Sequence, residues 1–482
     1  MTLLPNAPRT FTERDQLRFA RMSGDHNPMH MDPIAARRTQ AGVPAVHGMH
    51  LLLWSLESLL QAGKIDRPIM SISAVFSRFV RLHAPTRLRI LQHDEAAIEV
   101  AVDAAEVETG TITARFGASA VNVPARSDLP AIEHPDAVAR EVSLLEMKGY
   151  QGWIDRTPGY ADAADMFPQL AAAIGVGRVI AIAQLSCLVG MICPGLHSIF
   201  GGLDIALTST ADRPGIGFEV AVVSPRTRLV RMKVAGSGVS GIVNSFSRWP
   251  PVPQRSIEEL SGVVQPGEFA GSTALITGGS RGLGALTAKI LAAGGARVRI
   301  SYAVGAGDAA ELEQEINRFT GGSNCTSMQY DVMQPVAEPM RWFCRDVSHF
   351  YHFASPRIYR QKARVFEPGL LEEFMTAYVT AFEQLCSAIQ AQGAGRLVAF
   401  FPSSVFVGDD RPRDMVEYAM AKAAGEVLCE EMARTNGMAH AIFQRLPRML
   451  TDQTASLIPT MSLDPLETML PVIRTVQTTA AG

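Results

Sequence analysis

The sequence lacks the features that mark a disulfide scaffold, a zinc protein or a nucleic-acid-binding protein. Its six cysteines form no Cys-x-x-Cys pair and show no spacing typical of a metal site. Scattered single thiols of this kind usually pack as small apolar groups in a reducing compartment. The chain has no run of basic residues and a formal net charge of −3 at pH 7, which disfavours nucleic acid as a partner.

The sequence also lacks a stretch long and apolar enough to cross a membrane. The most apolar segment, 179–193, contains Gln184 and is shorter than the about twenty residues that a spanning helix needs. The N-terminus has neither the charged start nor the apolar core of a signal peptide. We therefore expect a cytoplasmic protein without a membrane span, in which 179–193 forms a buried helix.

What the chain does have is the composition of a well-packed globular protein. It contains 482 residues, of which 47% are hydrophobic and 19% charged. This length is too great for one core and predicts about two to four domains. The Trp-Pro-Pro run at 249–251 marks a sharp boundary, because consecutive prolines stop regular structure.

The most informative stretch is 23–32, which reads Ser-Gly-Asp-His-Asn-Pro-Met-His-Met-Asp. It places the Asp25 carboxylate and the His30 imidazole on one loop, and Gly48 then opens an apolar helix expected over 49–63. A carboxylate and an imidazole held together can activate a water molecule and later return its proton. A backbone N–H at a helix start can hold the oxyanion of a thioester carbonyl. These groups suit the addition of water to an unsaturated thioester, or its removal. The alternative is a polar turn that caps a helix.

This pattern resembles that of the MaoC-like (R)-specific enoyl-CoA hydratases, which have the hot-dog fold. Their signature, S-G-D-x-N-P-x-H-x-D followed by H-G-M, is matched in register by 23–32 and by the His-Gly-Met run that contains Gly48. The resemblance implies that Asp25 and His30 are the catalytic pair and that Gly48 donates to the thioester oxygen. It covers the N-terminal part of the chain only.

The order of one apolar helix followed by strand-like runs occurs twice. A helix that is apolar on all faces must be enclosed, here by a curled sheet. We therefore predict an α+β double hot-dog, with a catalytic hot-dog domain at 1–125 and a second, non-catalytic unit at 126–250. An unrelated α+β segment is the alternative for the second half. The strands of the first half are expected at 69–79, 86–92, 97–102 and 111–123. In the second half a helix at 167–193 precedes strands at 197–209, 215–223, 227–234 and 238–246.

After a predicted linker at 251–270, strands and helices alternate, which indicates βαβ units and a parallel sheet. An apolar strand at 272–276 leads into Thr-Gly-Gly-Ser-Arg-Gly-Leu-Gly at 277–284, and a helix and a second strand follow. Glycines at such a turn let the backbone approach a pyrophosphate on the helix N-terminus. We expect a Rossmann-type, doubly wound α/β domain at 271–482.

Further along, Tyr418 and Lys422 lie four residues apart and hence on one helical face, and Ser404 follows a strand expected at 395–401. The combination of T-G-x-x-x-G-x-G, Ser and Y-x-x-x-K resembles the short-chain dehydrogenase/reductases, especially the 3-ketoacyl-thioester reductases. It implies that Tyr418 exchanges a proton, with its pKa lowered by Lys422 and by the nicotinamide charge. Ser404 would hydrogen-bond the substrate carbonyl, and Ser403 is the alternative for that role.

NADPH is the predicted cofactor. The strand at 296–302 ends without the carboxylate that binds the ribose hydroxyls of NAD, and Arg281 resembles the arginine that meets the 2′-phosphate of NADPH. By this resemblance, the cofactor contacts are Gly278, Ser280, Arg281, Gly282, Leu283, Gly284, Asp331, Val332, Ala354, Tyr418 and Lys422.

Two features depart from the reductase pattern. The family's Asn-Asn-Ala-Gly reads His-Phe-Ala-Ser at 352–355, and the helix asparagine of the proton relay is missing, with Ala377 and Tyr378 in its neighbourhood. The relay is therefore expected to use water or another side chain, or turnover is slow.

Together the two resemblances predict a bifunctional enzyme of fatty acid metabolism. One centre would reduce a 3-ketoacyl thioester to the (R)-3-hydroxyacyl thioester with NADPH, and the other would interconvert this alcohol and the trans-2-enoyl thioester. The substrate would be an acyl-CoA or acyl-carrier-protein thioester, no metal is expected, and a homodimer is expected by resemblance. In one alternative only the hydratase centre is active and the reductase domain is degenerate. In the other, the chain is a non-catalytic scaffold that binds an acyl carrier.

Overall fold

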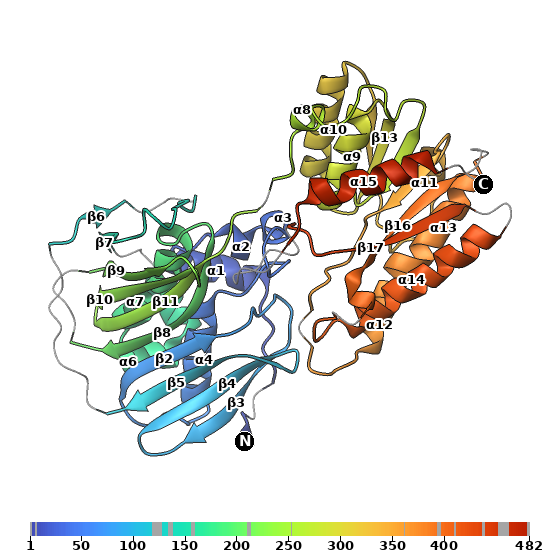
Figure 1. Ribbon diagram of the computed structural model, residues 1–482. Helices are drawn as coiled ribbons and strands as arrows, with labels where there is room; N and C mark the ends of the chain where they lie inside the picture. Colours follow the sequence, from blue (N-terminus) through green and yellow to red (C-terminus); the bar gives the residue numbers. More distant parts are fainter. Residues whose placement is uncertain are drawn as a thin grey trace. The chain divides into compact units, whose positions relative to one another are not determined.

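The protein consists of two compact units, each with a sheet and hydrophobic cores of its own (Figure 1). The first unit ends at Pro250 and the second begins at Pro251. The computed structural model describes residues 2–4, 7–117, 128–133, 138–155, 160–209, 214–251, 253–360, 362–392, 397–408, 411–435, 439–451 and 462–479. The prediction of a multidomain chain is confirmed.

Within the described residues of the first unit, a single sheet of 11 strands has the order β1-β3-β4-β5-β2-β8-β11-β10-β9-β7-β6. All neighbouring strands are antiparallel except β6 and β7. The two halves of the unit meet where β2 pairs with β8, from Ser71 opposite Ala206 to Val75 opposite Gly202. The strands are β1 (Thr2–Leu3), β2 (Ile69–Phe76), β3 (Thr86–His93), β4 (Ala97–Ala104), β5 (Val107–Phe116), β6 (Ala131–Ile132), β7 (Gln151–Ile154), β8 (Ser198–Leu207), β9 (Ile216–Ser224), β10 (Leu229–Gly236) and β11 (Val239–Ser247). The run predicted as a strand at 111–123 continues beyond the described residues from 118 onward.

Two apolar helices, α4 and α7, lie in the core of this unit. Leu52 and Leu56 of α4 and Ile182 and Leu185 of α7 are fully buried in the same cluster. Because most side chains of both helices are buried, each helix is covered by the sheet and by its neighbours rather than by solvent. The helices of the unit are α1 (Glu13–Ser23), α2 (Pro28–Met31), α3 (Pro33–Ala36), α4 (Gly48–Gln61), α5 (Tyr160–Met166), α6 (Pro168–Ile174) and α7 (Val176–Cys187), followed by the π-helical turn η1 (Leu188–Ile192).

The helix predicted at 167–193 is not continuous. Gly175, with φ +89°, separates α6 from α7, and the two segments are bent by 111°. The buried carboxylate of Glu57 on α4 accepts hydrogen bonds from the first N–H groups of α6, at Gln169 and Leu170. No single helix in the described residues is long and apolar enough to cross a membrane; this bent pair alone meets the length and composition, and its α7 part is buried in the core.

The second unit is built on six parallel strands in the order β14-β13-β12-β15-β16-β17, counted over the described residues. In chain order this is 3-2-1-4-5-6, the doubly wound arrangement in which ligands bind where the order reverses, here between β12 and β15. The strands are β12 (Thr273–Thr277), β13 (Arg297–Tyr302), β14 (Cys325–Gln329), β15 (His349–His352), β16 (Val398–Ser404) and β17 (His440–Leu446). The helices are α8 (Ile257–Leu260), α9 (Gly282–Ala293), α10 (Ala306–Thr320), α11 (Glu338–Phe343), α12 (Pro368–Met375), η2 (Thr376–Thr380), α13 (Ala381–Gln390), η3 (Val405–Val407), α14 (Val416–Arg434) and α15 (Pro465–Thr478).

The prediction that 251–270 is a linker is wrong for most of this segment. Ile257, Leu260, Val264 and Phe269 are buried in the core of the second unit. Ile257, Leu260 and Val264 recur at helical spacing, so one face of this segment is apolar and packs against the unit that follows it. The two units divide between Pro250 and Pro251, so the segment predicted as a linker belongs to the second unit.

Candidate active sites

The motif loop of the first unit is shaped by its own small residues. Helix α1 ends at Gly24, whose φ of +79° is a conformation that glycine adopts at no steric cost. Asn27 then caps α2, with its side chain accepting from the N–H of Met29 at 2.9 Å, and Pro28 opens that helix. Asp25 is thereby held in the turn between α1 and α2.

Asp25 is 1% exposed, and its carboxylate is held from both halves of the unit. Ser186, on α7, donates to Oδ2 at 2.6 Å, and the N–H of Asn27 donates to Oδ1 at 3.1 Å. Burial raises the pKa of Asp25, and the nearby His30 and the Ser186 hydrogen bond oppose that rise. The carboxyl group is therefore placed to hold and release a proton.

His30 and His47 lie beside this carboxylate with their rings stacked, the centroids 4.0 Å apart. Nδ1 of His30 lies 2.7 Å from the carbonyl oxygen of Ala45, so Nδ1 carries the hydrogen of this bond and Nε2 is the ring nitrogen left to exchange a proton. Nε2 of His47 lies 3.1 Å from the main-chain oxygen of Asp25. Burial lowers the pKa of His47 well below its usual range, so this ring is neutral and orients the loop.

The same three residues are the one group in the described chain whose ligand atoms could together hold a metal ion, all within 4.8 Å of one another. Their hydrogen bonds favour another use. His47 donates to the backbone of Asp25, and Ser186 occupies one carboxylate oxygen. What remains is Asp25 with Nε2 of His30, a pair suited to general acid–base chemistry.

Gly48 is the first residue of α4, directly after His47. The first N–H groups of a helix have no partner within it and can bind an oxyanion. An added Cβ at Gly48 would lie 3.2 Å from the ring of Phe76, so a larger residue would crowd this helix start.

Two residues that the sequence analysis missed come from the second half of the unit. Ser186 bonds to Asp25, and a Cβ at Gly190 would lie 2.4 Å from its Oδ1, so only glycine leaves room for the carboxylate. The carbonyl of Gly190 accepts from the side chain of Asn27 at 2.6 Å. Gly190 lies in η1, and π-helical turns are frequent at functional sites. The sequence signal was faint: a serine and a glycine within an apolar helix.

In the second unit, the glycine-rich turn lies where the strand order reverses. Gly278 has φ +65°, and a Cβ there would lie 2.7 Å from the backbone nitrogen of Ala354 after β15. A Cβ at Gly284 would lie 2.3 Å from the carbonyl oxygen of Gly278. Arg281 and Gly282 begin α9, so the helix N-terminus faces the turn. The turn thus keeps the shape that a dinucleotide pyrophosphate needs.

The other predicted cofactor contacts lie along the same edge of the sheet. Ser280 and Leu283 belong to this turn and to α9, and Asp331 and Val332 follow β14. Parallel strands end at a common edge, so these residues and Ala354 share one side of the unit. Asp331 is exposed, and its carboxylate accepts from the N–H of Met333.

The structure separates the two serines at the end of β16. Ser403 donates to Glu426, which is also paired with Arg445 through hydrogen bonds of 2.8 and 2.7 Å. The hydroxyl oxygen of Ser404 accepts from the N–H of Phe406 at 3.2 Å, and Ser404 lies near enough to the phenol of Tyr418 to lower its pKa. Ser403 therefore belongs to a supporting network, whereas Ser404 lies beside the phenol.

Tyr418 and Lys422 lie on α14 and are both buried, at 7% and 4% exposure. Burial raises the pKa of Tyr418 to about 12, opposed by the nearby Ser404 hydroxyl group, and lowers the pKa of Lys422 to about 7. The predicted lowering of the Tyr418 pKa by Lys422 is therefore wrong for the protein alone, in which burial raises this pKa. The ammonium lies 5.7 Å from the Tyr418 ring centroid and donates to the carbonyl of Pro402 at 2.7 Å.

His352 occupies the first position of the altered family motif, and both of its ring nitrogens have hydrogen-bond partners. Its Nδ1 lies 2.9 Å from the hydroxyl of Thr277, and its Nε2 donates to the carbonyl of Ala377 at 2.8 Å. Burial lowers the pKa of His352 to about 4, so the ring is neutral. It bridges β12, β15 and η2 beneath the site.

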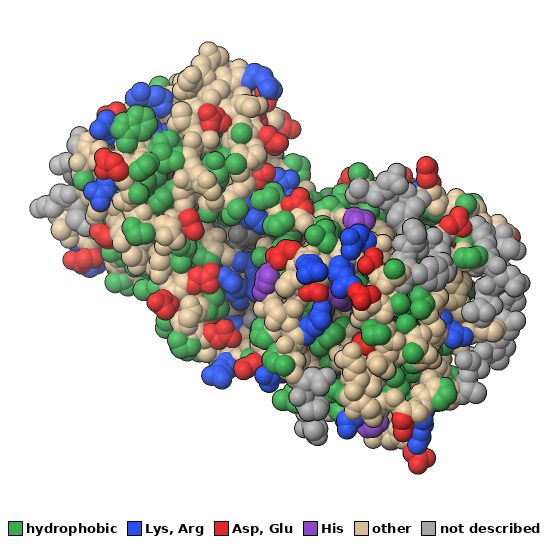
Figure 2. Space-filling model, turned by 180° about the vertical axis from the view of Figure 1, so that it is seen from behind, with side chains coloured by type: hydrophobic (Ala, Val, Ile, Leu, Met, Phe, Trp, Pro, Cys, Tyr) green, Lys and Arg blue, Asp and Glu red, His purple; other side chains and the backbone are tan. Residues whose placement is uncertain are grey.

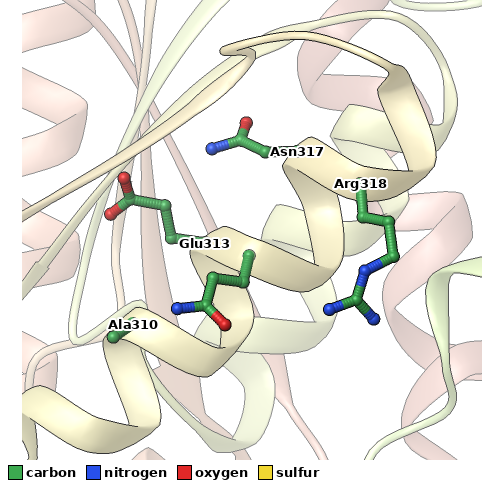
Figure 3. Close-up of a pocket in the computed structure, with 5 residues that line it drawn as sticks. Ala310, Glu313, Asn317 and Arg318 are labelled. Carbon is green, nitrogen blue, oxygen red and sulfur yellow. The ribbon is translucent and has the colours of Figure 1, made fainter.

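Charged side chains of both signs are interspersed over the face seen in Figure 2. A hollow on α10 is lined by residues of that helix alone (Figure 3). Among them, Asn317 is tied to the backbone of Cys325.

Comparisons with known proteins agree with this division. The family model described as a MaoC like domain matches residues 1–114, and the short chain dehydrogenase model matches residues 272–340. The chain therefore carries a MaoC-like domain at its N-terminus and a short-chain dehydrogenase/reductase domain further along, which confirms both resemblances. The second match ends before Ser404, Tyr418 and Lys422.

The similar curated proteins are named as short-chain dehydrogenases or reductases. "Short chain dehydrogenase/reductase nsrJ" of Aspergillus novofumigatus is 39% identical over 87 residues, 18% of this chain and 32% of that protein. "NADPH-dependent aldehyde reductase-like protein, chloroplastic" of Arabidopsis thaliana is 29% identical over 200 residues, 41% of this chain and 63% of that protein. The chain thus spans less than two thirds of each. A solved short-chain dehydrogenase from Burkholderia cenocepacia in complex with NADP is 21% identical, with a TM-score of 0.39, over 44% of this chain and 95% of that one.

Proposed function

We propose that this chain is a bifunctional enzyme acting on acyl thioesters. Its first unit would interconvert trans-2-enoyl and (R)-3-hydroxyacyl thioesters, and its second would reduce 3-ketoacyl thioesters with NADPH. The observation that carries the proposal is the pairing of buried Asp25 with His30 in one domain, and of Ser404 with Tyr418 in the other. Acyl-CoA and acyl-carrier-protein thioesters both fit this chemistry.

In the hydration reaction, His30 Nε2 and Asp25 would bind one water molecule and take its proton as the water oxygen attacks C3 of the enoyl group. The proton is returned at C2, so that one water is added across the double bond. The N–H of Gly48 stabilises the negative charge that develops on the thioester oxygen. Dehydration is the same path in reverse.

In the reductase, NADPH supplies a hydride when bound. Tyr418 would donate its proton to the carbonyl oxygen, and Ser404 would hold that oxygen in place through its hydroxyl group. Lys422 stabilises the phenolate that Tyr418 becomes. The shape of the turn at Gly278 and Gly284 supports binding of a dinucleotide.

We also propose that the first unit is a double hot-dog, with a catalytic half at 1–125 and a supporting half at 126–250. Two observations favour this division. A buried helix precedes four consecutive antiparallel strands in each half, and the halves join edge to edge through β2 and β8. The second half lacks the Ser-Gly-Asp motif but holds Asp25 in place through Ser186. A homodimer remains a prediction.

Mass spectrometry of the thioester products after mixing the protein with acetoacetyl-CoA and NADPH tests the proposal. We expect a 3-hydroxyacyl thioester together with an enoyl thioester. Tyr418→Phe should remove both products, whereas Asp25→Asn should remove only the enoyl thioester. Hydration of crotonyl-CoA without any reduction would favour the single-centre alternative, which the altered residues around His352 support. The absence of both activities with CoA and carrier-protein substrates would contradict the proposal.

A further inference from the structure

The ammonium group of Lys422 is buried without a carboxylate partner. Its side chain is 4% exposed, and none of the ion pairs in the described residues includes it. Its Nζ donates a hydrogen bond of 2.7 Å to the carbonyl of Pro402. A buried cation needs compensation from its surroundings, because the loss of hydration is costly. In this site the compensation comes from that hydrogen bond and from aromatic rings.

The ring of Tyr378 is the nearest of them. Nζ of Lys422 lies 3.8 Å from the Tyr378 centroid, compared with 4.8 Å for Phe401 and 5.7 Å for Tyr418. The negative face of an aromatic ring attracts a cation within about 6 Å, and more strongly when both are desolvated. Tyr378 is 1% exposed, so this contact is shielded from water.

The hydroxyl group of Tyr378 reaches the opposite side of the site. It lies 2.6 Å from Oγ of Ser355, the residue after Ala354. Tyr378 is the central residue of η2, a π-helical turn between α12 and α13. The carbonyl of its neighbour Ala377 is occupied by His352. The turn therefore fixes Tyr378 between Lys422 and the loop after β15.

We propose that Tyr378 is a positioning residue of the reductase site: the face of its ring holds the Lys422 ammonium beside Tyr418, and its hydroxyl group fixes Ser355. The catalytic role of this contact rests on the proposed reductase function. The contact between Tyr378 and Lys422 itself can be tested without measuring turnover.

The titratable groups around the ammonium come from three elements. Tyr418 and Cys429 share α14 with Lys422, Tyr378 belongs to η2, and His352 belongs to β15. His352 is neutral, and burial holds the Cys429 thiol protonated with a pKa of about 12. Near neutral pH none of these groups supplies a negative charge, so beside the hydrogen bond to Pro402 the nearest favourable contact of the cation is the ring face of Tyr378.

The experiment is an NMR titration of the full chain labelled at its lysine side chains, with Lys422→Met to assign the resonance. Tyr378→Leu removes the ring, and Tyr378→Phe keeps the ring but removes the hydroxyl. Phe374→Leu is the matched control for the Lys422 titration, because Phe374 packs against both Tyr378 and Tyr418 and is as buried as Tyr378, whereas no cation–π contact among the described residues joins it to Lys422. Phenylalanines with increasing ring fluorination at position 378 weaken the negative face while preserving its shape, which keeps the test available if Tyr378→Leu does not fold.

We expect the pKa of Lys422 to fall by about one unit in Tyr378→Leu, a tenfold change in its ionisation equilibrium. It should fall stepwise with fluorination and stay unchanged in Tyr378→Phe and Phe374→Leu. In the same variants, the pH profile of acetoacetyl-CoA reduction should move with the Lys422 pKa. An unchanged titration in both Tyr378→Leu and the fluorinated series would overturn the proposal. If the titration shifts but the wild-type chain reduces no thioester, the contact stands and the proposed reductase function fails.

Discussion

The hydroxyl of Ser186 donates a 2.6 Å hydrogen bond to the carboxylate of Asp25, although 160 residues separate them in the sequence. Ser186 lies on α7, in the half of the first unit that has no catalytic motif, and Asp25 lies in the half that does. The half without a motif therefore completes the environment of the proposed catalytic carboxylate.

Replacing Ser186 with alanine should weaken hydration. A hydrogen bond to a charged group contributes about 1.5–3 kcal/mol, so we expect kcat/KM for crotonyl-CoA hydration to fall by about tenfold to a hundredfold. The pKa of Asp25 should rise further, which shifts the acidic limb of the rate profile upward. Ser55→Ala is the matched control, because Ser55 is buried on α4 and donates only to the carbonyl of Leu51. Equal losses in the two variants would argue against a role for Ser186.

The close approach of Gly190 to Asp25 makes a second prediction. The Cβ of Gly190→Ala would lie 2.4 Å from Oδ1, so the carboxylate must shift and hydration should fall by at least about tenfold. Gly177→Ala, on α7 in the same half, meets no atom within 4 Å and should retain activity. It should even gain stability, since alanine is favoured over glycine in helices by about 1 kcal/mol. Measured hydration rates and melting temperatures check both; a fully active Gly190→Ala would contradict the assignment.

Asp25→Asn should lower the rate of hydration by at least about a hundredfold. The same variant should gain stability relative to the wild-type protein as the pH rises. The pKa of Asp25 is raised in the folded protein, so the folded state binds more protons than the unfolded state between the usual aspartate pKa and the raised value. The stability of the wild-type protein therefore falls as pH rises through that window. Asparagine does not ionise, so the variant lacks this loss of stability. The difference in Tm between variant and wild type should grow from acidic to neutral pH. Asp66→Asn, at a side chain that is 78% exposed, provides the control.

The two serines at the end of β16 should behave differently. Ser404→Ala should lower kcat for ketone reduction by about a hundredfold, because it removes a donor from the reacting oxygen. Ser403→Ala should mainly lower stability, by about 1 kcal/mol, because it removes a hydrogen bond to Glu426 while the pair with Arg445 remains. Steady-state kinetics and denaturant melts distinguish them, and the reverse pattern would exchange their roles.

Binding of NADPH can be tested apart from catalysis. An alanine Cβ at Gly284 would lie 2.3 Å from the carbonyl oxygen of Gly278, which would distort the turn. We expect Gly284→Ala to weaken NADPH binding by about tenfold or more in a fluorescence titration. Gly307→Ala on α10 has open space around it and should bind as the wild type does. Unchanged binding in Gly284→Ala would place the cofactor elsewhere.

The order of helices and strands was readable from the sequence because it is a local property. Apolar runs with the right period predicted α4 and the strands around it, and the turn at 277–284 predicted the start of α9. Local spacing also indicated that Asp25 lies near His30 and that Tyr418 lies near Lys422, since each pair lies within one turn or one helix. The prolines at 250–251 gave the boundary between the units, but not the packing of the next segment.

Only the tertiary structure decided which distant residues share each site. Ser186 and Gly190 approach Asp25 because α7 packs in the same core as the motif loop, and no local pattern records that contact. Tyr378 contacts Lys422 because η2 packs against α14. The region in which the reductase family has its helix asparagine thus presents an aromatic ring to the Lys422 ammonium. Burial then set the protonation of these groups. Local sequence fixes which ionisable groups are present, whereas the packing around them determines their pKa values.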